Sequence, residues 1–161
     1  MLPARSDGRR VGTATEPAAR RVTVQRVPPN TDPLPVVLAA AANGPTIVVH
    51  PAVAAARAIA KRLRRNGLTV ALVADEWDRA AGGVDVVVGT RVAVWAPCPD
   101  LAGIVVLDEH DEALQEERTP TWHARDVAIE RAARAGAACV LVSPSPTVSA
   151  LAAADRDLRR P

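Results

Sequence analysis

The sequence has very few aromatic residues. Phe and Tyr are absent, and the only aromatic side chains are Trp77, Trp95 and Trp122, so that aromatic residues make up 2% of the 161 positions. The core must therefore be filled by Val, Leu, Ile and Ala, which bury less apolar area per side chain than aromatic rings. Apolar residues still form 48% of the chain, which excludes a wholly disordered protein and indicates one compact domain.

Other absences exclude whole classes of protein. The two cysteines, Cys98 and Cys139, are too few for a disulfide framework or a four-ligand zinc site. No apolar run approaches the roughly 18 residues that a membrane span needs. At the start of the chain, no positively charged stretch leads into an apolar segment, so we expect no secretory signal. We therefore expect a cytoplasmic protein without a membrane partner.

Lysine is almost absent. Lys61 is the only one, and arginine supplies the other nineteen of the 20 positive side chains. The formal net charge of +2 is too small to indicate nucleic-acid binding by itself. Any chemistry that needs a lysine must therefore use Lys61.

The order of polar and apolar segments predicts the fold. Residues 1–21 are arginine-rich without apolar periodicity and predict a flexible tail, the folded domain spans 22–155, and 156–161 form a short tail. Within the domain, apolar runs of strand length alternate with helical patterns, which predicts an α/β fold with a three-layer parallel sheet of about five or six strands. The strands are expected at 22–27, 46–50, 69–73, 84–88, 103–107 and 138–142, and the helices at 32–43, 51–66, 75–81, 123–135 and from 147.

Ligands of an open parallel sheet collect at the carboxyl ends of the strands. Four such ends carry polar residues: His50-Pro51, Gly89-Thr90-Arg91, Asp108-Glu109-His110-Asp111 and the segment 143–147. An apolar strand that ends in adjacent carboxylates is how nucleotide hydrolases place a magnesium ligand and a water-activating base. Asp108, Glu109 and His110 are therefore candidate catalytic residues, with Asp108 as the candidate metal ligand. A solvated acidic turn is the alternative interpretation.

The acidic cluster, followed after eleven residues by His123-Ala124-Arg125-Asp126, resembles the primosomal protein N′ family of helicases that restart stalled replication forks. That family carries a D-E-E-H-D box and then H-A-R-D. Residues 86–91 with 95–97 are similar to its V-V-G-T-R-S-A-L-F-A-P element, and 142–147 stand where it has G-S-A-T-P-S. The resemblance covers roughly residues 22–155 and implies the first of two RecA-like motor lobes.

The same resemblance implies roles for single residues. It implies DNA contact by Thr90, Arg91 and Arg125, and coupling of nucleotide to motor movement by Ser143, Ser145 and Thr147. For Arg91 the structural alternative is capping of a helix end. For Arg125 it is an ion pair with Asp126 or with an acid of the 108–117 cluster.

The sequence departs from the family pattern at the phosphate loop. Residues 27–33 lack the glycines and the lysine of G-x-x-x-x-G-K-[ST], and their prolines remove amide donors. Asn30 and Thr31 occupy the place of the lost loop, and Asp32 would repel a phosphate. The acidic box is also one acid short, so that an ungapped count puts Leu107 at the family's first aspartate, whereas a gapped alignment puts Asp108 there. The family uses ATP and Mg²⁺, and zinc in a region without a counterpart here, but for this chain we expect no cofactor.

Three functions follow from these features. The first is a truncated, degenerate helicase lobe that binds single-stranded or forked DNA, or replisome proteins, without hydrolysing ATP. The second is a residual DNA-dependent ATPase or helicase lobe that needs a second lobe and uses Asp108 and Glu109 with magnesium. The third is a small metal-dependent α/β enzyme built from Asp108, His110, His123 and Asp126. A hydrolase that uses Ser143 has no G-x-S-x-G element to support it.

Overall fold

The computed structural model of the chain describes residues 22–158, and the predicted arginine-rich tail at 1–21 lies outside this range. The strands are β1 (Val22–Arg26), β2 (Thr46–Val49), β3 (Val70–Leu72), β4 (Val86–Gly89), β5 (Gly103–Leu107), β6 (Gln115–Glu116), β7 (Trp122–His123) and β8 (Ala138–Ser143). The α-helices are α1 (Leu34–Ala41), α2 (Val53–Arg65), α3 (Trp77–Ala81), α4 (Ala124–Ala135) and α5 (Val148–Leu158), and the 3₁₀ helices are η1 (Arg91–Trp95) and η2 (Glu112–Leu114). In the described range no helix has the length and apolar character to cross a bilayer.

Six of the strands form one parallel sheet in the order β1-β8-β5-β2-β4-β3. The predicted α/β fold with a sheet of about five or six parallel strands is therefore confirmed. Every residue of β2, β4 and β5 is buried, which explains why these strands read as continuous apolar runs in the sequence. The last helix runs to Leu158, and the division of the chain into domain and tails stays a prediction.

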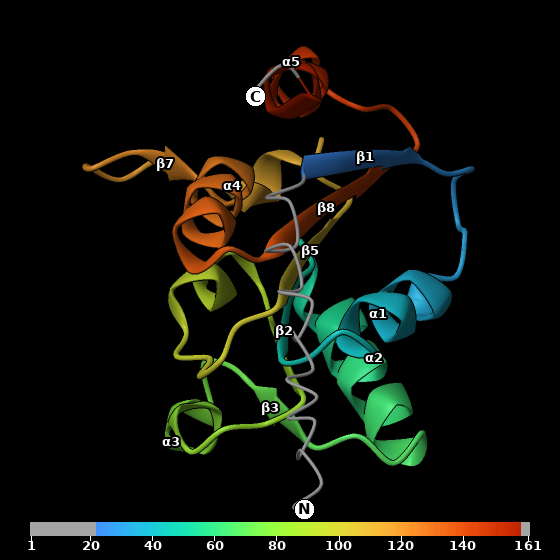
Figure 1. Cartoon of the computed structure of the whole chain (residues 1–161), viewed down its shortest axis with the longest axis vertical. Coiled ribbons are helices and arrows are strands. Elements are labelled where there is room, and N and C mark those ends of the chain that lie inside the picture. The colour runs from blue at the N-terminus through green and yellow to red at the C-terminus, as the bar shows by residue number, and fades with distance from the viewer. Residues whose placement is uncertain (1–21, 159–161) are drawn as a thin grey trace, which may run out of the picture.

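Helices cover both faces of the sheet, so that the molecule has three layers (Figure 1). Helices α1 and α2 pack on one face through small and branched side chains such as Val37, Ile59 and Leu63. On the other face lie α3, η1 and α4, whose buried contacts are mostly alanines, and α5 lies beside β1. The core thus consists of Val, Ile, Leu and Ala, as the shortage of aromatic residues predicts.

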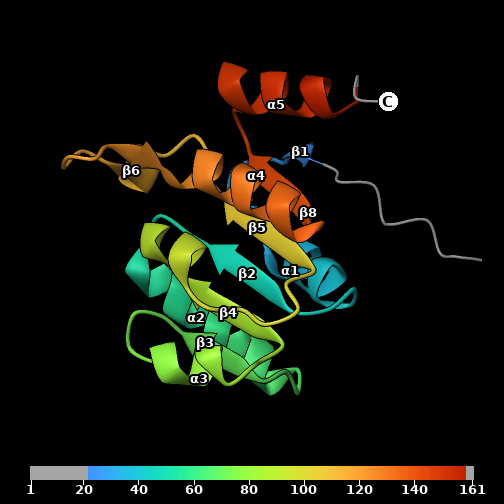
Figure 2. The same ribbon diagram turned by 60° about the vertical axis from the view of Figure 1, so that its left-hand side comes forward.

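A short antiparallel ribbon of β6 and β7 projects from the body of the domain next to α4 (Figure 2). It connects the acidic segment after β5 to the start of α4. The imidazole Nδ1 of His123 accepts a hydrogen bond from the amide of Arg125 at 3.1 Å and so caps α4, which ends at Gly136 in the left-handed conformation, with φ of 68°. The ribbon and the helix therefore join at a defined corner.

The last residue of β4, Gly89, lies very close to Val73, which follows β3. A Cβ atom added at Gly89 would lie 2.7 Å from both the carbonyl oxygen and Cγ2 of Val73. Only glycine fits at this point without displacing the backbone, and the fit places Thr90 and Arg91 at the carboxyl edge of the sheet.

Candidate functional site

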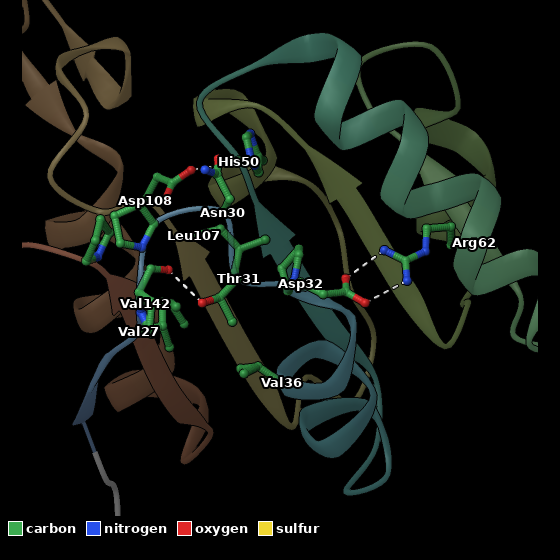
Figure 3. A pocket seen from close by; sticks show the side chains of 14 residues that line it. Val27, Asn30, Thr31, Asp32, Val36, His50, Arg62, Leu107, Asp108 and Val142 are labelled. Carbon is green, nitrogen blue, oxygen red and sulfur yellow. Dashed lines mark hydrogen bonds and ion pairs between the residues drawn. The ribbon is translucent and has the colours of Figure 1, made fainter.

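The carboxyl ends of β1, β2, β5 and β8 surround a cavity of about 460 Å³ (Figure 3). Segment 27–33 forms one wall, and His50, Arg62, Asp108 and Pro144 contribute further lining. This is the edge of the sheet at which the sequence predicts a ligand site.

The wall formed by segment 27–33 offers few free amide donors. Pro28, Pro29 and Pro33 have no N–H, and the amide of Leu34 at the start of α1 donates to Oδ1 of Asp32 at 3.1 Å. Thr31 turns back on the segment itself, where its hydroxyl donates to the carbonyl of Pro28 at 2.6 Å and its amide to the same oxygen at 3.2 Å. Because a phosphate cradle needs several amides aimed at one point, these groups do not fit the β- and γ-phosphates of ATP.

Asp32 and Arg62 form a two-pronged ion pair across the cavity wall. Nη1 of Arg62 lies 2.6 Å from Oδ1 of Asp32, and Nη2 lies 2.8 Å from Oδ2. The bonds from the guanidinium, together with the amide of Leu34, lower the pKa of the Asp32 carboxyl from 3.8 to about 2. The carboxylate is therefore ionised at physiological pH, and Arg62 is already engaged.

Asp108 is the candidate catalytic residue that faces the cavity. Its backbone is in the left-handed region with φ of 49°, and its carboxylate Oδ2 lies 3.6 Å from Nε2 of His50. The other ring nitrogen of His50, Nδ1, accepts a hydrogen bond from the amide of Ala52 at 2.9 Å. Burial lowers the pKa of His50 below its usual 6.5, which favours the neutral ring beside Asp108 at neutral pH.

Glu109 points elsewhere, into a network of hydrogen bonds with Thr147 and Arg125. Its Oε1 accepts the amide of Thr147 at 2.7 Å, and its Oε2 accepts the Thr147 hydroxyl at 2.9 Å and Nη1 of Arg125 at 3.4 Å. Arg125 also donates to Oγ1 of Thr147 at 3.1 Å and, through Nε, to Asp126 at 2.9 Å. The Glu109 side chain has no exposed surface and that of Arg125 is 10% exposed, so that this ion pair is shielded from solvent. Arg125 therefore has the ion-pair role that the sequence offers as the alternative to DNA contact.

The residues predicted to couple nucleotide and motor lie against the acidic box. The hydroxyl of Ser143 is 2.8 Å from Nδ1 of His110 and accepts the amide of Ser145 at 3.0 Å. Together with the bonds of Thr147 to Glu109, these contacts tie the end of β8 to the end of β5. Ser143 is fully buried, which leaves a hydrolase substrate no access to it.

Arg91 is partly exposed and is bound to the β6–β7 ribbon. Its Nη2 and Nε lie 3.1 and 3.3 Å from Oε2 of Glu116, and its side chain is 38% exposed. Nearby, Trp95 and Trp122 contact each other edge to face, with ring centroids 5.5 Å apart and Trp95 54% exposed. Both contacts hold the ribbon against η1, and sequence reasoning identified neither of them.

The constellation of the predicted metal enzyme does not assemble. Within residues 22–158 no three His, Cys, Asp or Glu side chains form a group that fits a metal ion. His110 contacts Ser143, and His123 caps α4, so that Asp108, His110, His123 and Asp126 serve separate local contacts. The catalytic, DNA-contact and coupling roles of the other predicted residues stay predictions.

A six-stranded parallel sheet with helices on both faces and polar loops at its carboxyl edge is an α/β fold of the RecA-like kind, in which ligands bind at that edge. No protein-family model matches the chain. About half of the chain is similar to replication restart protein PriA. It is 36% identical over 92 residues to PriA of Bacillus subtilis (strain 168), and this alignment covers 56% of this chain and 11% of that protein. For PriA of Chlamydia pneumoniae the identity is 40% over 74 residues, covering 45% and 10%, respectively. The matched segment thus spans about a tenth of these relatives, and the predicted resemblance is confirmed.

A solved structure supports the fold independently. A variant of Saccharomyces cerevisiae Dbp5, bound to Gle1 and IP6, superposes with a TM-score of 0.60 and 16% sequence identity. The match covers 88% of this chain and 40% of the Dbp5 chain. The RecA-like fold predicted from the family resemblance is therefore confirmed.

Proposed function

We propose that this chain is a PriA-like helicase lobe that binds single-stranded or forked DNA without hydrolysing ATP. The observation that carries the proposal is the composition of segment 27–33. Where a motor lobe needs amides and a lysine to hold phosphates, this chain has prolines and a carboxylate, Asp32, which occupies Arg62. A triphosphate that entered the cavity would meet the negative charges of Asp32 and Asp108.

The position of Glu109 adds support. A water-activating base must have a free carboxylate oxygen within reach of the ligand. Both oxygens of Glu109 are bonded to Thr147 and Arg125, and Glu109 is not among the residues that line the cavity. These bonds join the segment after β5 to the segment after β8, and we assign the network this structural role rather than catalysis.

Support for DNA binding comes from the resemblance to replication restart proteins and from the exposed part of Arg91. A guanidinium at the edge of the sheet, next to Thr90 and held by one acid, can contact a backbone phosphate. Such a contact is electrostatic and weakens as salt rises. We propose a cytoplasmic location on the same grounds, and replisome proteins as the second class of partner that the resemblance implies.

Fluorescence anisotropy with single-stranded and forked DNA, over a series of salt concentrations, tests the proposal. We expect micromolar binding that weakens with salt. Arg91→Ala should reduce the affinity and lower the slope of log K against log salt by about 1. Glu116→Gln should strengthen binding because it releases Arg91. Arg134→Ala is the matched control, since Arg134 is also a surface arginine paired with one acid, Glu130 on α4. Absence of binding at low salt contradicts the proposal.

A residual ATPase is the second candidate, and the position of Asp108 on the cavity favours it. Phosphate release from ATP should be measured with and without DNA. We expect no release above that of a blank without protein. Turnover that Asp108→Asn abolishes, while Asp75→Asn leaves it intact, would establish the second candidate and refute the first.

A further inference from the structure

The ion pair between Asp32 and Arg62 has the geometry with which an arginine holds a phosphate. Two parallel N–H groups of the guanidinium meet two oxygens at 2.6 and 2.8 Å. Carboxylate and phosphate compete for this same planar fork of donors. Among the described residues that line the cavity, Arg62 is the only arginine or lysine, and it reaches the cavity from α2 (Figure 3).

Asp32 is anchored so that it can act as a fixed anion. In addition to Arg62, it accepts the first free amide of α1, that of Leu34. It thus covers both the cation and the helix amide that an incoming phosphate would use. Its pKa of about 2 means that no physiological acidification neutralises it.

We propose that Asp32 is a tethered substitute for phosphate, and that Arg62 is a latent binding residue for phosphate-bearing ligands that Asp32 keeps blocked. The inference rests on the proposed function, because both assume that the cavity holds no nucleotide. The ligand class excluded in this way comprises pyrophosphate and the polyphosphate of nucleotides. Loss of the Asp32 charge converts the cavity into an anion site.

Asp32→Asn tests this idea with the smallest change. The asparagine oxygen still accepts the amide of Leu34, so that the start of α1 is preserved, but the carboxylate charge that neutralises Arg62 is removed. Binding of pyrophosphate to the 161-residue chain is measured by isothermal titration calorimetry. We expect Asp32→Asn to bind it roughly tenfold more tightly than the wild type, as regained hydrogen bonds to a charged group would give. Adding Arg62→Gln should abolish the gain.

Glu130→Gln is the matched control, because it frees a surface arginine, Arg134, from an ion pair outside the cavity. In that exposed pair, Nε of Arg134 lies 2.7 Å from Oε1 of Glu130. The control variant should leave pyrophosphate binding unchanged. If Asp32→Asn binds no better than Glu130→Gln while circular dichroism shows it folded, the inference is wrong. The same holds if the wild type already binds as tightly. If Asp32→Asn fails to fold, Asp32→Ser takes its place in the test, because the serine hydroxyl can also accept the amide of Leu34. The proposed function fails on different results, namely ATP turnover or absent DNA binding, so that the two failures are distinguishable.

Discussion

Replacement of Arg125 by methionine should expose how much the buried network contributes to stability. Arg125 is the only partner of Glu109 in this network that carries a positive charge, and the Glu109 side chain is fully buried. Methionine keeps much of the length and apolar stem of arginine but cannot donate. The variant therefore leaves a buried carboxylate with only the amide and hydroxyl of Thr147 as donors.

The cost of such an unpaired buried charge is about 3–5 kcal/mol in the free energy of unfolding. Domains of this kind have roughly 5–15 kcal/mol in total, so that the variant loses a large part of its stability. With a urea m-value of about 1–3 kcal/mol per molar, the midpoint of unfolding should fall by more than about 1 M.

Urea unfolding followed by circular dichroism measures this change. Arg134→Met is the matched control: Arg134 pairs with Glu130 on the exposed face of α4, and its loss should cost less than about 1 kcal/mol. The double variant Glu109→Gln with Arg125→Met removes both charges and should recover most of the loss. If Arg125→Met costs no more than Arg134→Met, or if the double variant is no more stable than the single one, the interpretation of the network as a buried ion pair is refuted.

Two further changes test other parts of the structure. Gly89→Ala should lower the free energy of unfolding by about 1–3 kcal/mol, because the new methyl group overlaps Val73. Gly82→Ala is the control and should have little effect, because a methyl group there would make an ordinary contact of 3.5 Å. Urea unfolding measures both variants. His123→Asn should reduce the pH dependence of stability. Burial lowers the pKa of His123 below 6.5 in the fold, so that the unfolded chain takes up more protons and the wild type loses stability as the pH falls through that value. Asparagine keeps a cap on α4 without titrating, and urea midpoints at about pH 7.5 and pH 5.5 give the difference. An unchanged difference would contradict this role of His123.

The strands of the sheet could be predicted because both of their faces are covered. A strand such as β2 or β5 is then a continuous apolar run, which is recognisable without knowledge of its neighbours. The β6–β7 ribbon could not be predicted in this way, since each of its strands has two residues and two residues carry no period. Its position depends instead on the contacts of Trp95 and Glu116, which join segments distant in the sequence.

The sequence predicted where the candidate site lies in the fold, but it did not predict which way the side chains of the site point. The sequence placed Asp108 and Glu109 together at the end of β5, and the structure has them there, but they point to different sides. Successive side chains near the end of a strand alternate in direction, and the left-handed backbone of Asp108 turns its carboxylate to the cavity. That alternation was the signal available in the sequence. The partners of Glu109, Arg125 and Thr147, follow only from the folded chain.

The position of β1 has a consequence for the order of folding. It pairs with β8, and Nε of Arg26 donates to the carbonyl of Pro144, 118 residues further along the chain. A ribosome that adds about 5–20 residues per second finishes the first strand roughly 6–24 s before its neighbour exists. In the complete chain, closing so long a loop is also slow, so we expect β1 to dock last, after the β2, β3 and β4 segments have assembled. Pulse-labelled hydrogen exchange during refolding should then show its amides protected after theirs.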